Sequence, residues 1–150
     1  MKFSAKGEYG IRAVLDVALY GDGGPVAVKD ISRRQVIPIR FLEQVMNALK
    51  KGGVVDSFRG ASGGYRLARL ATDINLAEVV SAVEGPVLVM DCLNQPDKMK
   101  GCDRKAECAI REVFYDVQVA VNDTLAAVTL SELIKRTADR EAARVPMFEI

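Results

Sequence analysis

Apolar residues at helical spacing dominate the chain and predict a mainly α-helical protein. A first helix is predicted over residues 3–20, where Ser4 is placed to cap the helix. Glycines and a proline in residues 21–25 end it, and residues 26–28 are expected to be extended before a short helix over residues 29–35. The apolar face of the first helix comprises Ile11, Val14, Leu15, Ala18 and Leu19.

A third helix is predicted after the break at Ile37, because Pro38 suits the first turn of a helix. It is expected to end at residues 50–52, where two lysines precede a glycine. A short helix, a tight connection and a longer amphipathic helix are typical of a helix-turn-helix, whose longer helix enters a major groove. The predicted apolar face of the longer helix comprises Ile39, Leu42, Met46 and Leu49.

Two strand-like segments, residues 54–58 and 65–67, flank a glycine-rich turn over residues 59–64. A hairpin with a basic tip is typical of a wing, and Arg59 is placed to enter a narrow minor groove. The alternative is an ordinary hairpin whose glycines merely permit positive φ. The predicted fold class is therefore mainly α with a small β-wing, with a winged helix-turn-helix region over residues 1–70.

The second half of the chain is predicted to hold a connecting helix within residues 71–89, a polar cysteine loop over residues 90–108, and further helices over residues 109–136. The long helix after the loop carries an apolar stripe that needs a partner, either the same helix of a second copy or the body of one monomer. A short helix over residues 129–135 and a flexible tail over residues 137–150 are expected to follow. The stripe comprises Ile110, Phe114, Val117, Val121 and Leu125, widened by Val113 and Ala120.

Charge divides the chain and narrows its function. The net charge is +1, but residues 1–70 carry 12 Lys/Arg against 6 Asp/Glu, whereas residues 71–150 carry 9 against 14. A basic first half suits a polyanion such as DNA. No apolar run approaches the roughly 20 residues that cross a bilayer, and no secretory signal opens the chain, so a cytoplasmic protein without membrane association is expected. An enzyme or metal carrier is disfavoured, because no acid–base pair or substrate-cradling motif is present.

Three cysteines, Cys92, Cys102 and Cys108, are the candidate metal ligands in a chain without histidine. Soft thiolates select zinc, copper(I) or iron–sulfur clusters. The gaps of nine and five residues match zinc sites poorly. A cluster takes four ligands, so the fourth must be a carboxylate, another oxygen or an amide. Three unrelated thiols, one of them redox-reactive, remain the alternative.

The chain resembles the Rrf2 family of bacterial winged-helix transcription regulators over roughly residues 1–136. The resemblance rests on the segments MKFSAKGEYG, LDVAL, DIS, FLEQV and RGASGGY together with the three cysteines. It implies a homodimer braced by the long helix, an iron–sulfur cluster in the cysteine loop, and operator DNA read by the third helix and the wing. Arg40, Glu43 and Gln44 match base-contacting positions of the family, and Arg59, with Gly60 and Ser62, matches the wing.

The ligand pattern departs from part of the family. IscR-like members space their cysteines five and five residues apart and use a histidine three residues after the third, where this chain has Arg111. NsrR-like members use a carboxylate near the amino terminus, which implies Glu8, from the same or the other subunit, as fourth ligand. The predicted cofactor is a cluster, [2Fe–2S] rather than [4Fe–4S] and prone to loss on purification, that senses iron–sulfur, redox or nitric oxide status. Some members bind no cluster and regulate cysteine metabolism through a protein partner, which is the alternative reading.

Overall fold

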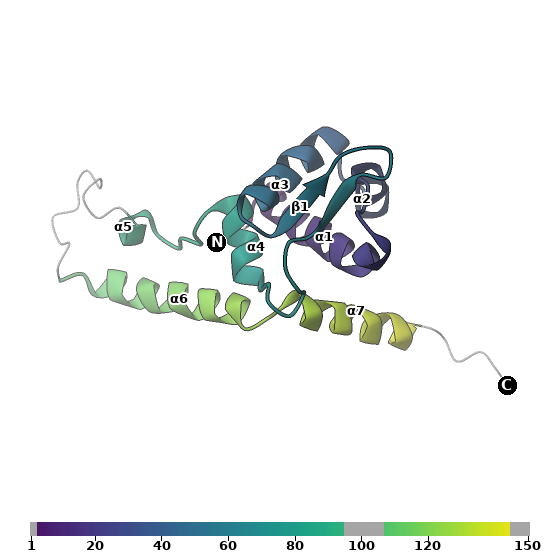
Figure 1. The fold of residues 1–150 in the computed structure, drawn as a ribbon. Coiled ribbons are helices and arrows are strands. Elements are labelled where there is room, and N and C mark those ends of the chain that lie inside the picture. Colours follow the sequence, from purple (N-terminus) through teal and green to yellow (C-terminus); the bar gives the residue numbers. More distant parts are fainter. Residues whose placement is uncertain (1–2, 95–106, 145–150) are drawn as a thin grey trace.

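The computed structural model describes residues 3–94 and 107–144. Helices and one two-stranded antiparallel sheet form this part of the chain, which confirms the predicted fold class (Figure 1). No helix in these ranges is long and apolar enough to span a bilayer. The elements are α1 (Ala5–Tyr20), a 3-10 turn (Gly21–Gly23), α2 (Val28–Gln35), α3 (Ile39–Lys51), β1 (Val55–Phe58), β2 (Gly64–Leu67), α4 (Leu76–Glu84), α5 (Asp91–Asn94), α6 (Ala109–Ala126) and α7 (Leu130–Arg144).

Helix α1 is the centre of the fold. Ser4 caps it as predicted, because its side chain accepts hydrogen bonds from the backbone N–H groups of Lys6 and Gly7. The helix packs against α2, α3, α4 and α7. One core joins these helices, and its fully buried side chains include Val14, Val17, Ile31, Leu42, Met46, Leu49, Val79 and Leu130.

The predicted helix-turn-helix is present as α2, a turn and α3. Pro38 is the N-cap of α3, and Leu42, Met46 and Leu49 are buried on its inner face. Ile39 differs from the prediction: it lies in the first turn at the edge of that face and is exposed. The helix is therefore anchored from Phe41 and Leu42 onward, and its first two residues are exposed.

The wing is built by a close backbone approach. Strands β1 and β2 pair in register from Val55 with Leu67 to Phe58 with Gly64. Val26 bridges to Tyr65 on the far side of β2, in the segment predicted to be extended. A Cβ atom at Gly64, where φ is +153°, would lie 2.2 Å from the Val26 carbonyl oxygen, so glycine is required there.

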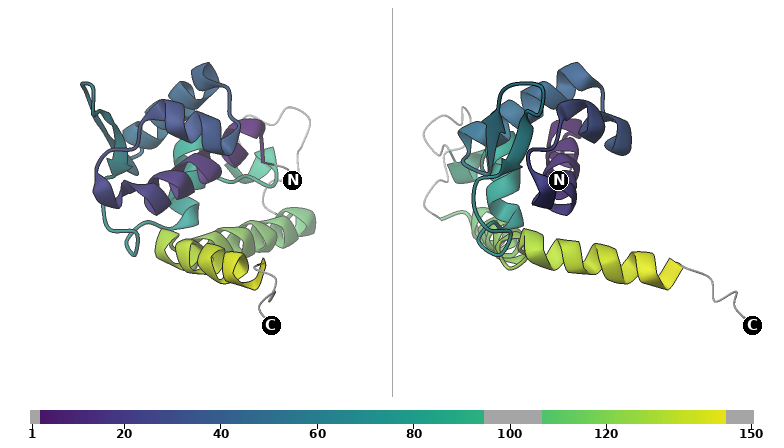
Figure 2. Two further views of the ribbon diagram at one scale, coloured as in Figure 1. Left: turned by 90° about the vertical axis from the view of Figure 1, so that its right-hand side faces the viewer. Right: turned by 45° about the vertical axis from the view of Figure 1, so that its right-hand side comes forward.

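Helices α4 and α7 start beside each other. The N–H of Leu76 donates to Val128 O at 2.9 Å, and the N–H of Leu130 donates to Ile74 O at 2.9 Å. The two views of Figure 2 show α6 and α7 following one another along one side of the α1–α4 bundle. The final helix is longer than predicted: it continues to Arg144, through most of the stretch expected to be a flexible tail.

Helix α6 contains no buried residue, although it carries the predicted apolar stripe. Its inner side packs on α4 and α5, where Val121 and Leu125 are half-buried. The remainder of the stripe faces away from the rest of the described chain. The exposed apolar residues of α6 include Ile110, Val113, Phe114 and Val117.

Candidate DNA-binding surface and cysteine site

The outward side of α3 carries the three polar residues that the sequence predicted for base contacts. Arg40, Glu43 and Gln44 are exposed, whereas Val45 and Met46 between the outward positions are buried. The 3.6-residue period of the helix produces this separation. These side chains therefore form a polar ridge on the exposed side of α3, and the apolar side chains of the helix face the core.

The wing carries the second group of predicted residues. Arg59, Gly60 and Ser62 are exposed in the turn between β1 and β2, and Gly60 adopts a φ of +107°, which favours glycine. Lys50 Nζ at the end of α3 donates to Ser57 Oγ of β1 at 2.6 Å. This contact ties the C-terminal end of α3 to β1 of the wing.

Two further residues of the ridge were not predicted from the sequence. Asn47 and Lys51 are exposed on α3, three and seven residues after Gln44. That spacing places them on the same side of the helix and was the available signal. Their amide and ammonium groups are suited to a base edge and a phosphate, respectively.

A buried ion pair fixes α2 against α1. The Asp16 side chain is 0% exposed and accepts from Arg34 Nη2 at 2.7 Å and Nε at 3.0 Å. Gln35 Nε2 donates to the same carboxylate at 2.9 Å, and the Arg34 guanidinium lies 4.1 Å from the centre of the Tyr20 ring. The hydrogen bond to Asp16 raises the pKa of Arg34. This network sets the position of the helix-turn-helix on the core.

Tyr65 connects the ridge and the wing electrostatically. Burial raises the pKa of Tyr65, and the nearby Glu43 carboxylate raises it further. The phenol therefore stays neutral at physiological pH. Glu43, which projects from α3, is close enough to β2 to act on a group at the base of the wing.

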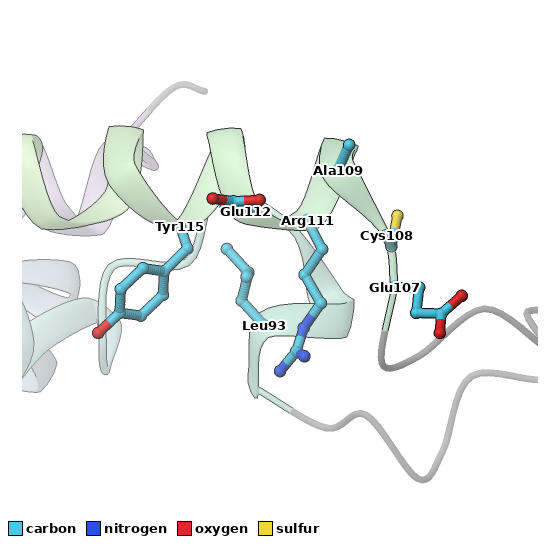
Figure 3. A pocket seen from close by; sticks show the side chains of 7 residues that line it. All are labelled: Leu93, Glu107, Cys108, Ala109, Arg111, Glu112 and Tyr115. Carbon is cyan, nitrogen blue, oxygen red and sulfur yellow. The ribbon is translucent and has the colours of Figure 1, made fainter.

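The two described cysteines lie in the part of the chain that follows α4, one in α5 and one at the start of α6. Cys92 is in α5, and Cys108 is the N-cap of α6 with no hydrogen bond from its side chain to the helix. Both are half-buried free thiols, whereas Cys102 lies outside the described residues. A cavity of about 470 Å³ adjoins Cys108 (Figure 3) and is lined by Leu93, Glu107, Cys108, Ala109, Arg111, Glu112 and Tyr115.

Figure 3 shows Arg111 extending from α6 past Leu93 of α5, at the position where the IscR-like pattern has a histidine. Glu8 is in the first turn of α1, where its side chain is 67% exposed and lies 3.9 Å from Arg12. Within residues 3–94 and 107–144, no three cysteine or acidic side chains come together in a metal-binding group. The structure of one protomer therefore does not bring Glu8 to the two described cysteines.

Glu84, at the end of α4, was missed by the sequence analysis. Its carboxylate accepts from the Ser4 N–H at 3.0 Å and the Gly7 N–H at 2.9 Å, and also from the Ser4 hydroxyl. An acid at the C-terminus of its own helix is unfavourable, whereas the N-terminus of α1 stabilises it. Because the partners are about 80 residues apart in the chain, no local pattern predicts this contact. It fastens α1 to the helix that leads into the cysteine segment.

Comparison with known proteins identifies the family. A family model described as Rrf2, iron-dependent transcriptional regulator, matches residues 3–136. IscR of Xenorhabdus nematophila is 38% identical over 94% of this chain and 87% of the relative. The structure of IscR from T. potens superposes with a TM-score of 0.74 at 33% identity, covering 96% of this chain and 91% of that one.

A second structural neighbour is CymR of B. subtilis, described as its global cysteine regulator. It superposes with a TM-score of 0.74 at 28% identity and covers 91% of this chain and 98% of that one. These relatives are transcriptional regulators rather than enzymes, and they share the winged-helix arrangement found here. The chain therefore belongs to the Rrf2 family of DNA-binding transcription regulators.

Proposed function

We propose that this regulator is a homodimer that senses iron–sulfur, redox or nitric oxide status through a cluster held by Cys92, Cys102 and Cys108. The observation that carries the proposal is the position of Cys108. It is the N-cap of α6, directly before the first residue of the helix, and its side chain makes no capping hydrogen bond. A ligand bound at its sulfur therefore acts directly on the helix whose outer apolar face is open.

The residues present fit a sulfur-bound cluster. Cys92 and Cys108 are half-buried thiols on adjoining elements, because α5 packs against α6. The positive end of the α6 dipole stabilises an anionic ligand at Cys108. When bound, a cluster supplies one-electron and ligand-exchange chemistry. The chain's own residues hold it and transmit its presence to α6.

Glu8 of the partner subunit is the proposed fourth ligand. The α1 carboxylate is exposed and its contact with Arg12, at 3.9 Å, is long, so it is available to another chain. Oxygen ligation is weaker and more exchangeable than thiolate ligation, which suits a sensor that must lose its cluster. We expect [2Fe–2S] rather than [4Fe–4S], in a protein that works in the cytoplasm.

We propose that each protomer reads one half of a near-palindromic operator. Arg40 suits guanine or phosphate, Gln44 suits adenine, and Glu43 accepts from a cytosine amine. Arg59 enters the minor groove, where Gly60 and Ser62 allow the wing to approach the backbone closely. The exposed apolar face of α6 supplies the contact between the two protomers.

Anaerobic purification tests the cofactor. We expect the wild type to be coloured and to contain iron and sulfide, and Cys102→Ala to contain much less of both. The variant Glu8→Ala is expected to retain the cluster but to lose it faster in air. A colourless, iron-free wild type prepared without oxygen would contradict the proposal.

A second candidate function is cluster-free control by thiol oxidation or by a protein partner. The similarity to CymR favours it, because that neighbour is a cysteine regulator, and an oxidised form of CymR from Staphylococcus aureus also matches. The two half-buried thiols supply the required chemistry. An iron-free protein whose operator affinity changes with peroxide in the wild type, but not in Cys108→Ala, would favour this function.

A further inference from the structure

We propose that Val36, in the turn between α2 and α3, is a specificity residue that packs against a thymine methyl group of the operator. Val36 has a φ of +54°, and no other non-glycine residue in the described ranges has a positive φ. A β-branched residue is strongly disfavoured in this left-handed region. The Val36 side chain is nevertheless 83% exposed, more than any other large apolar residue described.

The residues on either side of Val36 enforce this conformation. Before it, the Gln35 carbonyl accepts a hydrogen bond from Arg12, and the Gln35 amide donates to buried Asp16 at 2.9 Å. After it, the Ile37 carbonyl accepts from Ser32 Oγ at 2.6 Å, and the Ile37 side chain is buried. Strained conformations persist where their surroundings over-determine them in this way, and they gather at functional sites.

The folded monomer gains nothing from valine at this position. Its exposed side chain contributes little packing, whereas glycine or asparagine would adopt the same φ at lower cost. A residue that is costly in the isolated protein and exposed to solvent is explained by a contact made outside the protein. That contact must be apolar, because valine has no donor, acceptor or charge.

The place of Val36 in the fold identifies the partner. It is the C-cap of α2, in the turn three residues before Ile39, which is the first residue of the helix that carries the exposed polar ridge. The amino-terminal residues of a recognition helix are those that approach base edges. The apolar feature displayed there by the major groove is the thymine C5-methyl group. Phosphate is excluded as the partner, because it requires a donor or a cation.

The variant Val36→Gly separates stability from recognition. We expect it to unfold at a higher temperature than the wild type, because glycine relieves the strain. We also expect it to bind the operator, selected from a randomised duplex pool with the wild type, about fourfold to tenfold more weakly, since each buried methyl-sized group contributes about fourfold. The dependence of binding on salt should be unchanged, because no phosphate contact is lost.

Replacing operator thymines one at a time by deoxyuridine locates the contact. Wild-type affinity should fall about fourfold at one position in each half-site, and Val36→Gly should be insensitive at that same position. Leu70→Ala, which truncates another strongly exposed apolar side chain near the C-terminal half of α1, is the control and should bind as the wild type does. Unchanged affinity of Val36→Gly, or equal sensitivity of both proteins to every methyl deletion, would overturn the proposal.

Discussion

At the scale of single residues, the polar side chains that matter most are of two kinds: exposed side chains on α3, and one buried carboxylate that stabilises the packing of two helices. Arg40, Glu43 and Gln44 could be predicted because an amphipathic helix leaves its polar side exposed. Asp16 could not be assigned from the sequence, because an acid between Leu15 and Val17 does not disclose its partner. The side chains that donate hydrogen bonds to this carboxylate come from another helix, and only the packing of α1 on α2 brings donors and acceptor together.

Removal of the Asp16 carboxylate should destabilise the whole domain. We expect Asp16→Ala to lower the free energy of unfolding by about 3 kcal/mol, because it leaves the partly buried Arg34 charge without its partner. Asp30→Ala removes the exposed pair with Arg33 and should cost less than about 1 kcal/mol. Urea denaturation measures both. Equal losses in the two variants would show that the buried pair has no special role.

The phenol of Tyr65 gives a pH dependence with a defined sign. Its pKa is raised in the folded protein, so above about pH 10 the unfolded chain releases a proton that the folded protein keeps. The free energy of unfolding should therefore fall as the pH rises through that range, and less steeply in Tyr65→Phe.

The variant Glu43→Gln tests whether the Glu43 carboxylate contributes to the raised pKa of Tyr65. It should lower the pKa of Tyr65 without restoring the ordinary value, because burial still acts. The titration is followed by tyrosinate absorbance, as the difference between proteins with and without the Tyr65→Phe change. Glu141→Gln on α7 is the control. An unchanged Tyr65 titration in Glu43→Gln would contradict the proximity of α3 and the wing.

At the scale of elements, local signals decided what could be predicted. Ser4, Pro38 and the wing glycines mark boundaries that the structure confirms. The predicted end of α7 was wrong because residues 136–144 have no apolar stripe that would indicate a helix. Good helix formers such as alanine, arginine and glutamate continue the helix there. Helix α5 has only four residues, which is too short for a periodic pattern.

The wing depends on the close approach of the Gly64 backbone to the Val26 carbonyl group. Gly64→Ala should lower the free energy of unfolding by more than about 1 kcal/mol, because the new Cβ would meet the Val26 carbonyl in a backbone conformation that favours glycine. Operator affinity should fall with it, since the wing is displaced. Gly23→Ala, where a Cβ meets nothing within 4 Å, is the matched control and should be near neutral. Normal operator binding by a stable Gly64→Ala protein would contradict a role for the wing.

At the scale of the whole molecule, α1 joins the two functional regions. The N-terminus of α1 is held by Glu84, the last residue of α4, which is the helix that precedes the cysteine segment. In the second half of α1, Asp16 accepts hydrogen bonds from Arg34 and Gln35 of α2. Neither contact could be predicted from local sequence. Together they connect α4, which precedes the cysteine segment, through α1 to the helix-turn-helix.

Dimerisation through the outer face of α6 is the prediction for the assembly. Val113→Asp should raise the dimer dissociation constant by more than about tenfold, because an unpaired carboxylate would be buried between protomers. Val119→Asp is the matched control: Val119 is 38% exposed against 59% for Val113, and it lies about 120° around the helix from Val113, outside the apolar stripe. Light scattering across a dilution series measures both. Equal behaviour of the two variants would contradict an interface on this face.

The most direct test of the central claim is the operator affinity of one anaerobic preparation measured with its cluster and after the cluster has been removed by a chelator. We expect the affinity of the wild type to change at least about tenfold, which corresponds to about 1.4 kcal/mol of coupling, and the affinity of Cys102→Ala to stay constant under the same treatment. Identical affinities of the loaded and cluster-free wild type would contradict it.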